Sequence, residues 1–201
     1  MASPPWLEIT KDVVNILAVP ATLLLAYLGF GAWRREHRGK SRYEVARQLL
    51  KSTIAYRDIL QEARNPMMQG YESHGREVKE EETPEQATRR NTIFAWSKRI
   101  DKVNEVRREF YLNRLDAEVL WPDRIPGLCD AFHKLHVELV VNLRSYFMIT
   151  ERKSSVEANT DLLKRAEAVI WAGDEPDKFK DKLDSSLKSL DEFLRPHILL
   201  K

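Results

Sequence analysis

The sequence predicts an all-α protein in which one apolar helix near the N-terminus precedes a bundle of about five helices. Three observations lead to this prediction. Residues 13–33 form a long apolar run without a charged side chain, and later segments repeat apolar residues every three or four positions. The chain also has only seven glycines and lacks the alternating β-branched runs that are typical of strands.

The apolar run is long enough to span a bilayer. Its 21 residues make a helix of about 31 Å, and the hydrocarbon core of a membrane is about 30 Å thick. We therefore interpret 1–12 as a short extracytoplasmic leader and 13–33 as an uncleaved transmembrane helix. The alternatives are a buried core helix and a cleaved signal peptide. A signal peptide usually has a basic start and a shorter apolar stretch.

A basic collar follows the apolar run at 34–42. Its charge is +4, whereas the leader carries −1. Short flanks rich in lysine and arginine stay in the cytoplasm, so we expect a single-pass protein of the inner (plasma) membrane with its N-terminus outside and its C-terminal domain cytoplasmic. We also expect the collar cations to contact anionic lipid head groups. They are Arg34, Arg35, Arg38, Lys40 and Arg42.

The cytosolic domain is predicted to comprise 43–201. Ser41 and Glu44 have the spacing of a capping box, which predicts that a new helix begins there and continues to about Arg64. Asn65 and Pro66 end it. Residues 66–83 are polar and include an acidic run, which predicts a mobile loop, either a solvated spacer or a partner-docking segment.

The longest helix is predicted from Thr83 to Trp121. A threonine cap, a proline at the first helical position and Gln86 three residues after the cap mark its start. Arg107 and Arg114 interrupt its apolar stripe, which favours a bundle over a long coiled coil. The stripe consists of Ile93, Trp96, Ile100, Val103, Phe110, Ala117 and Trp121.

Three further helices complete the predicted bundle. The first runs over 126–153, the second begins at a capping box at 154–157 and ends near Trp171, and the third begins near Pro176 and stops at Pro196. Each repeats leucine or phenylalanine at helical spacing. Five helices after the collar therefore share one core.

Composition excludes several classes of function. Residues 43–201 carry a net charge of −1 once the leader and collar are subtracted from the +2 of the chain. A near-neutral domain argues against nucleic-acid binding, and no Walker or dinucleotide motif is present. The single cysteine, Cys129, excludes an internal disulfide. We expect no cofactor and no catalytic residue.

Three stretches together resemble a known type of protein. They are the collar with "YEVARQLLKSTIAYRDIL", the turn "RNP" and the closing "DEFLRPHI". They resemble uncharacterised bacterial proteins with one N-terminal span and a helical cytosolic domain. The resemblance implies a bacterial inner membrane and no particular activity.

One cluster suggests metal chemistry. Cys129, His133 and His136 lie on one arc of a helix, and both residue types bind zinc. Three parallel side chains on one helix do not easily enclose a tetrahedral ion, so we expect them to be core or hydrogen-bonded side chains.

The predicted function is therefore a membrane-tethered helical interaction or scaffold module. Its expected partners are an anionic lipid bilayer and either another protein or a second copy of the chain, but not nucleic acid. One alternative is a metal-dependent enzyme built around the cysteine and the two histidines. Another is a membrane-acting effector that the cytosolic domain regulates.

Overall fold

The computed structural model describes residues 39–78, 81–151, 156–173 and 176–199, together with Thr22 and Tyr27. The chain divides into two units, Met1–Glu44 and Val45–Lys201, and the architecture below is that of the second unit. Within the described residues the regular structure is helical and contains no strand. The predicted all-α bundle is thus confirmed for this part of the chain.

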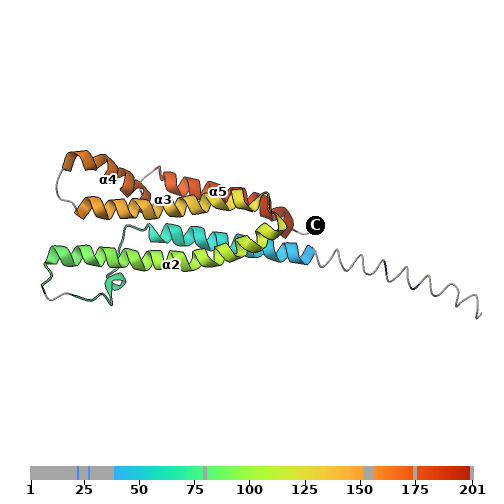
Figure 1. Ribbon diagram of the computed structural model, residues 1–201, viewed down its shortest axis with the longest axis horizontal. Helices are drawn as coiled ribbons and strands as arrows, with labels where there is room; N and C mark the ends of the chain where they lie inside the picture. The colour runs from blue at the N-terminus through green and yellow to red at the C-terminus, as the bar shows by residue number, and fades with distance from the viewer. Residues whose placement is uncertain are drawn as a thin grey trace, which may run out of the picture. The chain divides into compact units, whose positions relative to one another are not determined.

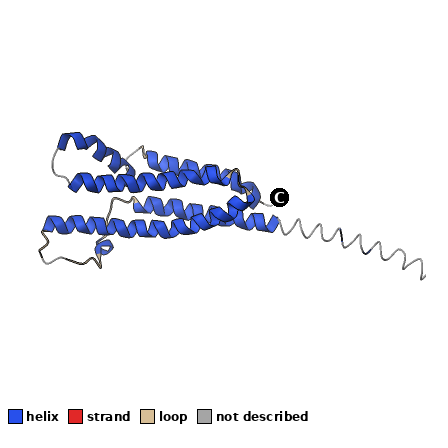
Figure 2. Cartoon of the chain, in the orientation of Figure 1, coloured by secondary structure: helices blue, strands red, loops and turns tan. Residues whose placement is uncertain are grey.

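Five helices and one short turn of 3₁₀ helix make up the described structure, and Figures 1 and 2 show their arrangement. The first helix covers 39–63. It is followed by η1 (Gly70–Ser73), α2 (Pro84–Leu120), α3 (Ile125–Glu151), α4 (Val156–Ile170) and α5 (Lys178–Ile198).

The start of α2 follows the predicted capping box. The Thr83 hydroxyl accepts a hydrogen bond from the Gln86 backbone N–H at 3.3 Å, and the Gln86 side chain accepts one from the Thr83 N–H at 3.2 Å. These bonds satisfy two donors at the helix start. Pro84 occupies the first helical position, where its missing N–H costs nothing.

Side-chain pairs show how the long helices run. Arg107 and Arg114 of α2 contact His136 and Asp130 of α3, so these two helices are antiparallel. The 39–63 helix is antiparallel to α5, because Arg57 lies against Asp184 while Arg64, farther along the chain, meets the start of α5. The fourth helix, α4, packs against α3.

The core lies between these helices and is rich in aromatic rings. Tyr56 of the 39–63 helix stacks on Phe110 of α2 at 5.2 Å between ring centroids, and Phe132 of α3 lies 5.6 Å from Phe110. At one end of the bundle Trp96 contacts Trp171, and at the other Trp121 contacts Phe193. The stripe predicted for α2 is buried at Trp96, Val103, Phe110 and Ala117, but Ile93 is exposed.

Two predicted helix ends are wrong. Residues 39–44 are helical, so the helix does not begin at Ser41. The last helix continues past Pro196 to Ile198. A proline in the final turn removes only one hydrogen bond, and Trp121 and Phe193 pack against the ring of His197 beyond it.

The predicted localisation requires a correction. Among the residues that the structure describes, none of the helices combines the length and apolar character needed to cross a membrane. This finding overturns the prediction of a single-pass inner membrane protein, and the lipid-contact role of the collar is not carried forward.

Most of the residues behind that prediction lie outside the described part of the chain. This holds for the predicted leader and transmembrane helix, apart from Thr22 and Tyr27, and for Arg34, Arg35 and Arg38. Lys40 and Arg42 are described and lie exposed on the 39–63 helix.

Candidate functional site

A groove lies between the end of the 39–63 helix, the first half of α2 and the segment that contains η1. Its cavity volume is about 500 Å³, within the range of ligand-binding pockets. The lining combines an apolar floor with charged walls. The residues that line this groove are Ile59, Glu62, Ala63, Asn65, Met67, Gln69, Tyr71, Glu72, His74, Lys98, Arg99 and Lys102.

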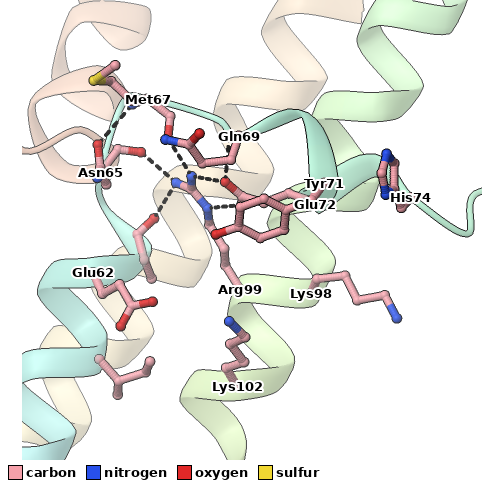
Figure 3. Close-up of a pocket in the computed structure, with 12 residues that line it drawn as sticks. Glu62, Asn65, Met67, Gln69, Tyr71, Glu72, His74, Lys98, Arg99 and Lys102 are labelled. Atoms are coloured by element: carbon pink, nitrogen blue, oxygen red, sulfur yellow. Dashed lines mark hydrogen bonds and ion pairs between the residues drawn. The ribbon is translucent and has the colours of Figure 1, made fainter.

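Arg99 of α2 holds the outer wall of the groove in place (Figure 3). Its Nε and Nη2 donate to the two carboxylate oxygens of Glu72 at 2.6 and 2.8 Å. Its Nη1 donates to the carbonyls of Ala63 and Asn65, and Nη2 also donates to the carbonyl of Met67. All five guanidinium N–H groups are therefore used within the chain, so Arg99 positions the segment rather than binding a ligand.

The same contacts shape the loop that the sequence predicts to be mobile. Glu72 also accepts a hydrogen bond from the Gln69 backbone N–H at 2.8 Å. The hydrogen bonds from Arg99 lower the pKa of Glu72, so the carboxylate stays ionised and the clamp stays closed near neutral pH. Mobility of 66–83 stays a prediction, but 67–72 has defined anchors.

The clamped segment presents large apolar side chains to the outside. Met67 and Tyr71 are 69% and 66% exposed although the backbone beneath them is fixed. Lys98 and Lys102 extend from α2 and Glu62 from the 39–63 helix, so cations and an acid stand on opposite walls (Figure 3). None of these three charged side chains forms an ion pair with another described residue.

A second arginine, Arg64, is fully buried beside the groove. It forms a two-pronged ion pair with Asp177, with both N–O distances at 2.9 Å, and donates to the carbonyls of Val169 and Trp171. Burial raises the pKa of Asp177, but the hydrogen bonds from Arg64 and from the Lys180 N–H outweigh it, so the net pKa is lowered. Arg64 thus joins the 39–63 helix to the α4–α5 connection.

The predicted metal cluster takes a different form. Cys129 is completely buried, His136 is nearly so and His133 is exposed. His133 pairs with the Tyr111 hydroxyl at 3.0 Å, and His136 pairs with Arg107. In the described part of the chain no three His, Cys, Asp or Glu side chains are arranged to hold a metal ion, so the metal-enzyme alternative gains no support.

The α2–α3 seam instead contains a buried polar cluster. His136 Nε2 accepts from Arg107 Nη1 at 2.8 Å, which places the proton of the neutral ring on Nδ1. Neither that Nδ1 nor the buried Tyr56 hydroxyl has a hydrogen-bond partner among the described residues. Burial, with Arg107 and His133 nearby, lowers the pKa of His136 to about 4.

Sequence reasoning did not single out Arg99, and it named Arg64 as the end of the first helix. A signal for both is present in the helical periodicity. Arg99 stands between Trp96 and Val103 on the apolar stripe of α2, and Arg64 follows Leu60 by four residues on the buried side of the first helix. A cation inside an apolar stripe indicates a buried charge that must find its partners elsewhere in the chain.

No protein-family model matches the chain, and neither a curated protein nor a solved structure was found that matches it. The resemblance to uncharacterised bacterial proteins therefore stays a prediction.

Proposed function

We propose that the chain is a helical interaction module that binds an acidic segment of a protein, anchored by an apolar side chain, in the groove. The observation that carries this proposal is the pair Met67 and Tyr71, held exposed by the Arg99 clamp. If the Arg99 clamp only fixed a surface loop, that loop would be expected to turn its large apolar side chains inward. The exposure of Met67 and Tyr71 instead favours contact with a partner.

The charges at the groove favour an acidic partner. The cation of Arg99 is paired with Glu72, whereas Lys98 and Lys102 form no ion pair with a described residue, although Lys102 contributes to the lowered pKa of Glu72. Two lysines against the single Glu62 leave the groove basic. Complementary charge guides association and selects partners more than it adds affinity.

The floor of the groove supplies the apolar part of the contact. Ala63 is buried and Ile59 half-buried, and both line the groove together with the exposed Met67 and Tyr71. A leucine or phenylalanine of a partner would bury apolar surface on both sides at once, at about 25 cal/mol per Å². Because the clamp already orders the wall, little entropy is lost on binding.

The test is a selection of displayed random peptides on the immobilised full chain. Enriched peptides should combine acidic and large apolar residues, and their binding should weaken about tenfold or more with Met67→Ala or Lys102→Glu. The matched controls are Met148→Ala on α3 and Lys188→Glu on α5, which are similarly exposed and lie away from the groove.

Two results would contradict the proposal. One is enrichment of peptides without acidic residues. The other is equal weakening by the groove variants and their controls, since that would place the contact elsewhere on the chain.

A further inference from the structure

One side of α2 is exposed along most of its length. The exposed positions follow each other at helical spacing from the groove to the end of the helix. They are Lys98, Asp101, Lys102, Glu105, Arg108, Glu109, Leu112, Leu115, Asp116 and Val119. We call this the open side of α2.

The two ends of the open side differ in chemistry. The end at the groove carries Lys98 and Lys102. The far end carries three large apolar side chains, Leu112, Leu115 and Val119, with exposures of 59%, 57% and 82%. Glu109 lies about one turn before these three and Asp116 lies between Leu115 and Val119; neither acid forms an ion pair with a described residue.

The far end therefore has the composition that the groove favours in a partner: acidic residues beside large apolar ones. The two ends also face the same side of the helix. Lys98 and Asp116 are 18 residues apart, which is five turns of 3.6 residues, so they point to the same side about 27 Å apart.

We propose that the segment bound in the groove is the far end of α2 from a second copy of this chain. The two α2 helices pair antiparallel about a two-fold axis midway between Lys98 and Asp116. Each groove then receives the apolar end of the other copy, and the contact closes after two subunits. This inference rests on the proposed function and names the occupant of its groove.

The antiparallel register pairs opposite charges at its two ends and groups apolar side chains. Lys98 faces the partner subunit's Asp116, and the same pair recurs on the other side of the axis. The partner subunit's Leu112 comes level with Lys102, where Met67 and Tyr71 stand exposed. Near the axis Glu105 meets the partner subunit's Glu109 at two symmetric positions, and the two Arg108 side chains offset part of the repulsion among these four acids.

Charge reversal tests this register in the full chain, with sedimentation velocity over a range of concentrations. Lys98→Glu and Asp116→Lys should each raise the dissociation constant of the dimer about tenfold or more, because each places like charges at both ends of the contact. The double variant should restore the wild-type value to within about threefold. Lys188→Glu on α5 is the control and should change nothing.

Disulfide trapping gives an independent measurement. The variants Lys98→Cys and Asp116→Cys should form a linked dimer on oxidation only when they are mixed. Each alone places its two thiols far apart across the axis. The native Cys129 is completely buried and does not compete.

Three outcomes would overturn the inference. They are a monomer at every concentration, a dimer that Met67→Ala and Lys98→Glu leave unchanged, and a link that forms within Lys98→Cys alone. A monomeric chain that still selects acidic peptides through Met67 would refute the dimer and leave the proposed function standing. A monomeric chain that selects none would refute both.

Discussion

Two parts of the bundle bury polar side chains in opposite ways. At the end beside the groove, Arg64 and Arg99 satisfy their donors with carbonyls and a carboxylate each. At the α2–α3 seam, His136 keeps an unpartnered Nδ1 and Tyr56 an unpartnered hydroxyl within the described residues. The arginines are ionised and paired, whereas His136 is buried as a neutral ring.

This difference shows that buried polar side chains play two roles in the bundle. The paired arginines join segments far apart in the sequence, so their loss should be severe at any pH. The seam tolerates its polar groups only while His136 is uncharged, so its contribution to stability should depend on pH.

Replacing Arg64 should have the largest effect. Arg64→Met leaves Asp177 and several carbonyls buried without their donor, which should cost about 3–5 kcal/mol in the free energy of unfolding. Urea denaturation of the full chain measures this loss. Arg195→Met removes an exposed ion pair with Asp191 and is the control, expected to leave the midpoint nearly unchanged. Equal effects from both would contradict the role assigned to burial.

Replacing Arg99 should lower the free energy of unfolding less than replacing Arg64 does. Its effect should be concentrated in the clamped segment. Arg99 and Glu72 are slightly exposed, so Arg99→Met should cost about 2–3 kcal/mol. Hydrogen exchange should accelerate at the amides of Met67, Gln69 and Glu72 well before the rest of the bundle opens. Unchanged exchange there would show that the clamp does not order the segment.

Acid should weaken the seam before it weakens the arginine clusters. The pKa of His136 falls from an unfolded value of about 6.5 to about 4 in the fold, so the unfolded chain binds more protons between these values. Stability present above pH 6.5 should thus decline as the pH falls, by about 2 kcal/mol between pH 7 and 5.

The pH range distinguishes the loss of stability caused by His136 from the loss caused by the carboxylates. Glu72 and Asp177 have lowered pKa values, so their contributions are lost only at still lower pH. Urea midpoints at pH 7 and 5 provide the measurement. His136→Gln should flatten the decline, while His74→Gln, an exposed histidine, should not. A decline that survives His136→Gln would locate the titrating group elsewhere.

The smallest effect is expected at an exposed cap. Thr83→Ala removes the side-chain oxygen that accepts from the Gln86 N–H and should cost about 1 kcal/mol, independent of pH between 5 and 7. Thr88→Ala, one turn into the same helix, is the control for helix propensity. Thermal denaturation compares them, and equal losses would mean that the cap adds nothing.

Local signals predicted the helices well. The capping box at Thr83 and the turn at Trp121 act within a few residues of the bond they make, so sequence alone could place them. Pro196 misled because a proline near a helix end costs little when aromatic rings pack beyond it. The capping-box spacing at Ser41 also misled, because Ser41 lies inside a helix that already includes residues 39 and 40.

Local sequence patterns could not predict which residues pair over long distances along the chain. The acceptors for Arg99 lie 27 to 36 residues away, and Asp177 lies 113 residues from Arg64. Spacing shows that a cation interrupts an apolar stripe, but it does not show which loop the cation reaches. The groove depends on these contacts, so its lining could not be predicted although its helices could.

The burial of Cys129 makes this residue a labelling probe for the rate of unfolding. Burial raises the pKa of this thiol to about 12, and the side chain is completely shielded, so alkylating reagents cannot react with it in the folded state. Because it is the single cysteine, each labelled molecule records one opening of the core. At high reagent concentration, the rate of mass gain therefore equals the rate at which the bundle opens.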